Sequence, residues 1–285
     1  MIRTAAAVLA LFATTLGSGL ATPHVGSQDL TPYGAAVHLS GKIGPRAAAS
    51  RGETRAQRYV TAQFRSAGLA VSIDKFNVPG KGTSRNVVGE LDTPASCLLI
   101  LVAHVDSGPD GPGANDNASG VGVLVALAHE LKGLQPPCDV WLASTGAEER
   151  GFTHAANHLG AAALVGRVKR LGRTSDLRFA YDNDEVGRLG RFWLRSPVSS
   201  PRDGVEGAIL SAARRAGVTV RWVRDEGTGN SDEREFNLAG MGAAVLEGWH
   251  ANEPCRELPC DRPRRLQKRS LNRALRVAEE VAKGA

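Results

Sequence analysis

The chain has 285 residues, of which 42% are hydrophobic, enough to build the core of one α/β domain. Its formal net charge is +6, and only the stretch 262–276 is densely basic. Because this stretch lacks the stacking aromatic residues of nucleic-acid-binding surfaces, we interpret it as a solvent-facing helix and expect no nucleic-acid partner.

The first 21 residues have the layout of a secretory signal peptide. Arg3 precedes a short apolar stretch at 5–16, and small residues follow up to Ala21. We therefore expect residues 22–285 to form a single mature domain that is exported, extracellular or periplasmic, and free of the membrane after cleavage. The alternative interpretation is a buried or membrane-anchoring N-terminal helix.

Helix and strand patterns alternate along the rest of the chain. The run 97–104 is continuously apolar, as expected of a strand covered on both faces in a parallel sheet. This alternation predicts an α/β fold with a mostly parallel, mixed central sheet and helices on both faces. Strands are predicted at 71–78, 86–91, 97–104, 140–144, 176–181, 218–223 and 243–247, and helices at 51–70, 121–134, 155–165, 205–216 and 266–282.

Acidic residues and one histidine follow three of these predicted strands. In a parallel sheet, the carboxyl ends of the strands lie along the edge where α/β proteins bind ligands. Each residue alone has an ordinary explanation, such as a helix N-cap, a first-turn acid or a core histidine. Several acids in one small volume would repel one another, so the pattern predicts a bound cation. The residues are His104, Asp106, Asp116, Glu148, Glu149, Asp182 and Asp184.

The four cysteines fit an oxidising compartment, where disulfides persist. Cys255 and Cys260 share a polar loop, whereas Cys97 and Cys138 each open an apolar run. If the two strands are neighbours, the sulfurs of Cys97 and Cys138 can meet. The alternatives are reduced cysteines or a metal site, although the lack of a C-x-x-C pair disfavours cysteine-bound zinc.

Four short motifs contain most of the polar residues at the strand ends. They are His104-Val-Asp106-Ser, Gly113-Ala-Asn-Asp116-Asn-Ala-Ser-Gly, Gly146-Ala-Glu148-Glu149 and Asp184-Glu-Val-Gly187, and Asn86-Val-Val and Ser231-Asp232 accompany them. In order and approximate spacing they resemble the dizinc aminopeptidases of metallopeptidase clan MH, which include aminopeptidase Y and secreted bacterial leucyl aminopeptidases. The resemblance runs from about Gly44 to Leu266 and implies the phosphorylase/hydrolase-like fold of zinc exopeptidases.

The resemblance also implies a role for each matching residue. Two divalent cations would share and activate a water, and a general base would take its proton and pass it to the leaving amine. The cations would also hold the free amino group of a peptide substrate, which favours removal of N-terminal residues. The implied first-zinc ligands are His104, Asp116 and Asp184, with Asp116 bridging both zincs; Glu149 is a second-zinc ligand, Glu148 is the general base, and Asp106 orients the ligand histidine.

The C-terminal loop departs from the family pattern, which reads approximately Cys-Tyr-His-Thr-x-Cys-Asp. Here the loop reads Cys255-Arg-Glu-Leu-Pro-Cys260-Asp261, and the matching cysteines imply a disulfide between them. Glu257 takes the position of the histidine that ligates the second zinc. Arg256 takes that of a tyrosine that helps to stabilise the oxyanion, so it either does the same or pairs with Glu257 and blocks the site.

We predict that Glu257 ligates the second metal together with Asp116 and Glu149. Because all three are carboxylates, this ion should be held less selectively than in the histidine-bearing enzymes and exchange more readily with manganese. His250 is an alternative ligand, and Glu233 replaces the histidine usual after Ser-Asp.

The predicted function is therefore that of a secreted, monomeric, zinc-dependent aminopeptidase. One alternative is a glutaminyl-cyclase-like acyltransferase that uses one zinc on the same fold. The loop at 115–120 and the residues before the two glutamates are more similar to those of the peptidases. The second alternative is a metal-free or weakly active binding protein. The several acids at the strand ends argue against it, because a site without a cation has no reason to keep them together.

Overall fold

The computed structural model describes residues 30–149, 158–225, 231–248 and 254–284. The predicted signal peptide and His250 lie outside these residues. Among the described helices, none is both long and apolar enough to cross a membrane.

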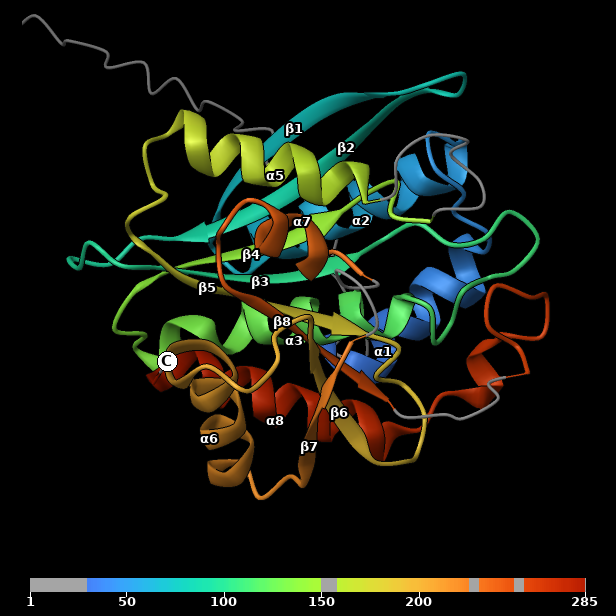
Figure 1. Ribbon diagram of the computed structural model, residues 1–285. Helices are drawn as coiled ribbons and strands as arrows, with labels where there is room; N and C mark the ends of the chain where they lie inside the picture. The colour runs from blue at the N-terminus through green and yellow to red at the C-terminus, as the bar shows by residue number, and fades with distance from the viewer. Residues whose placement is uncertain (1–29, 150–157, 226–230, 249–253, 285) are drawn as a thin grey trace, which may run out of the picture.

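The described strands form one eight-stranded sheet in the order β1-β2-β4-β3-β5-β8-β6-β7 (Figure 1). Its centre, from β4 through β3 and β5 to β8, is parallel, and antiparallel pairs join β1, β2 and β6 to it. The strands are β1 Ala70–Val78, β2 Gly82–Leu91, β3 Leu98–His104, β4 Asp139–Thr145, β5 Leu177–Asp184, β6 Phe192–Ser196, β7 Val220–Arg224 and β8 Ala243–Gly248. The predicted mixed α/β fold is thus confirmed.

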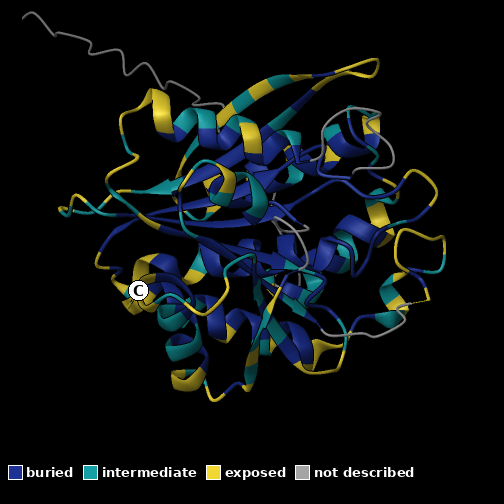
Figure 2. Ribbon diagram, in the orientation of Figure 1, coloured by how far each residue is buried: buried dark blue, intermediate teal, exposed yellow. Residues whose placement is uncertain are grey.

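Helices cover both faces of the sheet, which explains the continuous apolar runs of the central strands. Every residue of β3 and β4 is buried, and Figure 2 shows these strands in the dark centre of the molecule. Successive residues of β3 pack into different clusters: Leu99 and Leu101 join one cluster, and Leu98 and Ile100 join the other.

Most helices lie on one face, and α5 and α7 lie on the other. The first face carries α1 Pro32–Val37, α2 Arg51–Ser66, α3 Ala118–Leu134, α6 Ala208–Arg215 and α8 Lys268–Gly284, and the second carries α5 Leu159–Arg170 and α7 Glu233–Leu238. Short π- and 3-10 segments complete the set: η2 His38–Ile43, η3 Asp203–Gly207 and η4 Pro263–Arg265.

Helix α3 is buried nearly all round and brings its first turn against the end of β5. The Asn117 side chain caps the helix by accepting from the N–H of Gly120 at 2.9 Å. A Cβ atom at Gly120 would lie 2.1 Å from the carbonyl oxygen of Asn183, so glycine permits this close approach. The approach sets Asp116, just before the helix, beside Asp184 at the end of β5.

Several elements differ from those predicted. The helix expected at 205–216 divides into η3 and α6, and the helix expected from 155 is described only as α5, from Leu159. Five further elements were not predicted, namely α1, η2, β6, α7 and η4. Strand β6 has only five residues, one of them arginine. This stretch is too short for an alternating pattern to be recognised in the sequence. The basic stretch ends in α8, whose Lys268, Arg269 and Arg276 are exposed as expected.

Both candidate disulfides form, Cys97–Cys138 and Cys255–Cys260. Strands β3 and β4 are parallel neighbours, with Leu98 opposite Asp139, so the cysteines that precede them lie side by side. The first bond closes a separation of 41 residues and the second a separation of only 5.

Replacing both Cys97 and Cys138 with serine should lower the free energy of unfolding by about 4 kcal/mol, because the cross-link no longer restricts the unfolded chain. The matched double replacement of Cys255 and Cys260 should cost about half as much, since its loop is short. Denaturant unfolding of both variants measures the two losses. Equal losses would show that loop closure is not the main contribution.

Candidate active site

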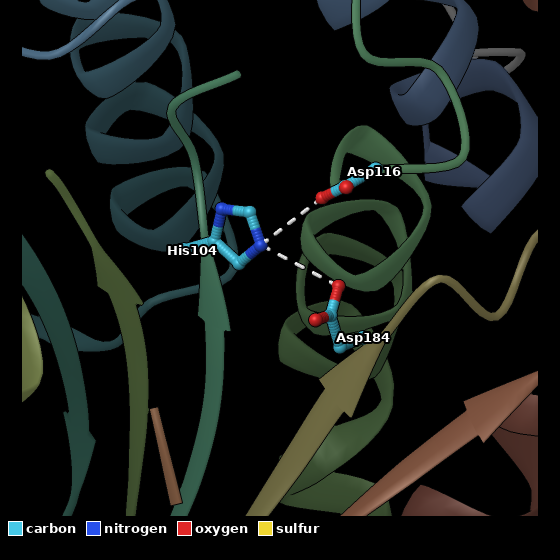
Figure 3. Close-up of side chains that lie close together, drawn as sticks. All are labelled: His104, Asp116 and Asp184. Atoms are coloured by element: carbon cyan, nitrogen blue, oxygen red, sulfur yellow. Dashed lines mark ion pairs between the residues drawn. The ribbon is translucent and has the colours of Figure 1, made fainter. Parts of the chain in front are cut away.

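Three side chains from different elements meet at the carboxyl edge of the sheet. His104 is the last residue of β3, Asp184 is the last residue of β5, and Asp116 immediately precedes the capped start of α3. The Nε2 atom of His104 lies 3.3 Å from Oδ1 of Asp116 and 3.4 Å from Oδ1 of Asp184 (Figure 3). The ligand atoms of this trio lie within 4.8 Å of one another, close enough to share one ion.

A second trio consists of His104 and the two glutamates that follow β4. The ligand atoms of His104, Glu148 and Glu149 also lie within 4.8 Å of one another. Oε2 of Glu148 is 4.0 Å from the His104 ring. The two trios share the histidine, so the predicted base Glu148 and the predicted second-zinc ligand Glu149 lie close to the predicted ligands of the first zinc.

Asp106 holds the turn that carries the two glutamates. Its carboxylate accepts the backbone N–H groups of Glu148 and Glu149, each at 3.1 Å. The same carboxylate lies 3.6 Å from Nδ1 of His104, the residue that it was predicted to orient. Asp106 therefore connects the histidine with the Glu148–Glu149 turn.

The chemistry of this cluster fits a divalent cation. Both ring nitrogens of His104 are buried without a hydrogen-bond partner, as are Oδ1 of Asp184 and Oε1 of Glu149. Burial raises the pKa of Glu148 and of Glu149 well above the usual range, and the neighbouring acids, including Asp116, raise both further. For His104, burial is outweighed by Glu148 and Asp184, which raise its pKa. An imidazole among carboxylates is a donor set that zinc accepts.

Two further residues fix the loop between His104 and Asp116. The carboxylate of Asp261 accepts the N–H groups of Asn115 and Asp116 at 2.9–3.0 Å, which ties the C-terminal loop to the predicted bridging ligand. Arg46 is fully buried, and its guanidinium donates to the carbonyls of Pro112 and Gly113 and of the residue after His104. No sequence pattern marked Arg46, because its partners are main-chain atoms far along the chain.

The cluster opens into a cavity of about 490 Å³, and its lining residues are charged or polar apart from Val245. Arg256 lines it and pairs with two acids that the motifs did not single out, Glu185 and, at 3.1 Å, Glu247. Glu257 lines the same cavity but belongs to neither trio of potential ligand atoms, so its metal-binding role stays a prediction. The remaining lining residues are Asp116, Glu148, Glu149, His158, Asp184, Arg195, Ser231 and Val245.

The Ser231-Asp232 motif borders the cavity through Ser231. Asp232 is buried and accepts the hydroxyl of Thr145, the last residue of β4, and burial raises its pKa to about 7. Glu233, in place of the usual histidine, is buried and accepts the N–H of Ser231 at 3.0 Å. Within the described part of the chain, Glu233 is absent from the cavity lining.

A family match identifies the chain as a metallopeptidase. Residues 86–282 match the sequence profile of peptidase family M28, and the chain belongs to this family.

Curated relatives include a probable lipoprotein aminopeptidase, LpqL, of Mycobacterium tuberculosis, 31% identical over 57% of this chain and 34% of its own length. Aminopeptidase YwaD of Bacillus subtilis is 29% identical over 57% of this chain and 35% of its own length. Leupeptin-inactivating enzyme 1 of Streptomyces exfoliatus is 28% identical over 84% and 55% respectively. The chain thus spans between about a third and about half of the length of these relatives.

Solved structures of similar fold include the zinc aminopeptidase BSAP of Bacillus subtilis, with a TM-score of 0.78 and 16% identity over 88% of this chain and 93% of that chain. A glutaminyl cyclase of Bacteroides thetaiotaomicron follows, with a TM-score of 0.73 and 19% identity over 89% and 96%. At these identities the likeness describes the fold, which both the predicted function and its acyltransferase alternative share. The predicted family is confirmed by the profile match.

Proposed function

We propose that this metallopeptidase is a secreted aminopeptidase that removes residues from the free N-terminus of peptides with the help of two zinc ions. The observation that supports this best is that two groups of potential ligand atoms share His104, and that Glu148, which belongs to the second group, places Oε2 4.0 Å from the histidine. The aminopeptidase activities for which LpqL, YwaD and BSAP are named agree with it.

In this proposal, His104, Asp116 and Asp184 hold the first ion, and Asp116, Glu149 and Glu257 hold the second. When bound, such ions lower the pKa of water, polarise the scissile carbonyl and receive the substrate's amino group. The side chains around the two ions transfer the proton and stabilise the developing oxyanion.

Glu148 takes the proton of the attacking water and passes it to the leaving amine. Asp106 keeps the turn that bears Glu148 in place through its two backbone hydrogen bonds. Arg256, although paired with Glu185 and Glu247, keeps 46% of its side chain exposed on the cavity wall and can donate to the developing oxyanion.

Metal analysis combined with a panel of aminoacyl anilides tests the proposal. We expect about two zinc ions per chain and release of the aniline only from substrates with a free amino group. Cyclisation of N-terminal glutamine without hydrolysis of the anilides would instead favour the glutaminyl cyclase alternative. Protein that binds no zinc and performs neither reaction would indicate the metal-free binding protein.

The export and monomer proposals are tested separately. Two disulfides within the described residues fit an oxidising compartment. Determining the N-terminal residue of protein recovered from the culture medium should place cleavage near Ala21, and light scattering of that protein should give the mass of one chain. Recovery only from the membrane fraction would support the anchoring alternative.

Glu257→His should raise the zinc affinity of the second site by about tenfold or more, because zinc favours nitrogen over a third carboxylate oxygen. Glu257→Ala should lose the second ion, while the first remains bound. Zinc and manganese titrations measure both constants, with His250→Ala as the control. If His250→Ala removed the second ion and Glu257→Ala did not, the alignment of the 255–261 loop would be wrong.

A further inference from the structure

A buried histidine that belongs to none of the motifs lies against the proposed general base. His158 immediately precedes α5 and is 1% exposed. Its backbone N–H donates to the carbonyl of Glu148 at 3.2 Å, and the next N–H, of Leu159, donates to Ala147 at 3.1 Å. His158 also has a positive φ of 52°, an uncommon conformation for a residue other than glycine. The main chain therefore holds its side chain beside Glu148.

The imidazole lies between two carboxylates. Its Nε2 atom is 3.2 Å from Oε1 of Glu148, and its Nδ1 atom is 3.5 Å from Oε1 of Glu235 on α7. Glu235 is itself fixed by Arg234, whose Nη1 atom lies 2.6 Å away. The ring thus has a carboxylate at each nitrogen and almost no contact with water.

The two oxygens of the Glu148 carboxylate face different partners. Oε1 faces His158, whereas Oε2 is the atom that approaches His104, at 4.0 Å. A glutamate side chain has several rotatable bonds, so a free carboxylate would spend much of its time in other orientations. A base is effective only when the correct oxygen lies within hydrogen-bond reach of the proton that it takes.

We propose that His158 is a positioning residue for Glu148: its Nε2–H group donates to Oε1 and thereby keeps Oε2 directed at the attacking water. This inference rests on the proposed function, since it assigns His158 a part in the same reaction. Nδ1 lies 3.5 Å from Glu235 without a hydrogen-bond partner, so the backbone hydrogen bonds and the burial of His158 hold the ring in place. His158 touches neither substrate nor metal in this role.

Two substitutions separate positioning from packing. His158→Phe keeps an aromatic ring of similar size but has no donor, and should lower kcat about 10- to 100-fold with KM and zinc content within about twofold of the parent. His158→Gln can donate from its side-chain amide and should recover most of that loss. His129→Gln is the matched control and should leave kcat unchanged, because His129 is a half-buried histidine of α3 that lies 3.3 Å from Gln63 and does not line the cavity.

Parent-like kcat in His158→Phe would overturn the inference, as would an equal loss in the Phe and Gln variants. If the parent itself hydrolyses no aminoacyl anilide, that result contradicts the proposed function but not this contact. The contact can then still be tested in the metal-free protein by nuclear magnetic resonance of the histidine rings. The Nε2–H proton of His158, assigned by its loss in His158→Phe, should shift in Glu148→Gln, while the His129 signals stay in place. An unprotonated or unshifted Nε2 would refute the contact.

Discussion

Replacing Glu148 with glutamine should lower kcat about 1,000-fold, within the range that a positioned general base contributes. Glutamine has nearly the same shape and still accepts a hydrogen bond, but it cannot take a proton from the attacking water. Oε2 of Glu148 lies on the side of His104, so the missing base would be felt at the reacting atoms. Zinc content should not change, because the proposed ligands are retained. Steady-state kinetics on an aminoacyl anilide, together with metal analysis, measure both quantities.

Glu280→Gln is the matched control for this change. Glu280 lies on α8 and pairs with Arg215 at 3.0 Å, away from the cavity. Its replacement should leave kcat within about twofold of the parent, since surface ion pairs contribute little. If Glu148→Gln kept kcat within about tenfold of the parent while retaining zinc, Glu148 would not be the base and the mechanism would need another proton acceptor.

Asp116→Asn should abolish activity and remove the stabilisation that zinc gives the folded protein. Asp116 is the proposed bridge, and its Oδ1 atom lies 3.3 Å from His104 Nε2 in the same trio as Asp184. A metal ion that binds only the folded state stabilises that state by about 4 kcal/mol when its free concentration is about 1,000 times its dissociation constant. A neutral amide is a much weaker ligand, so most of this gain should be lost.

The metal-free protein should respond in the opposite direction. Without a cation, the acids around His104 repel one another, and burial already raises the pKa of Glu148 and Glu149. Removing one negative charge relieves this repulsion, so metal-free Asp116→Asn should be at least as stable as the metal-free parent.

Thermal unfolding with zinc and with a chelator checks both expectations for Asp116→Asn. Asp110→Asn serves as the control, because Asp110 belongs to the same connection between β3 and α3 but is exposed. It should behave as the parent in both conditions. An increase of Tm with zinc in Asp116→Asn equal to that of the parent would contradict the role of Asp116 as a ligand.

At position 256 this chain has arginine where the family pattern has tyrosine, and the residues around the cavity show what the arginine requires. A guanidinium in a half-buried position needs carboxylates beside it, and Arg256 has Glu185 and Glu247. Glu247 also pairs with Arg195, at 2.9 Å, and Arg195 in turn pairs with Asp225. Arg256 is therefore part of a chain of alternating charges, which the loop sequence alone did not reveal.

The alternation of helices and strands and the family could both be predicted from the amino-acid sequence alone. Apolar runs such as 97–104 are local signals, and burial on both faces of a parallel sheet leaves them unbroken. The residues that follow such runs lie at the carboxyl edge of a parallel sheet, in whatever order its strands are arranged. The amino-acid sequence alone was therefore enough to group His104, Glu148 and Asp184. Short elements such as β6 could not be predicted, because five residues carry too little periodicity.

The contacts that support the site, in contrast, depend on the tertiary structure. Asp106 bonds to residues 42 and 43 positions away, Arg256 pairs with a residue 71 positions away, and Arg46 donates to a carbonyl 59 positions away. Such contacts depend on which strands become neighbours and on how loops cross the sheet edge, and no local pattern of residue types records this. His158 is the clearest case: a single histidine before a helix has no motif, and its place beside Glu148 follows from the packing of α5 and α7 on one face of the sheet.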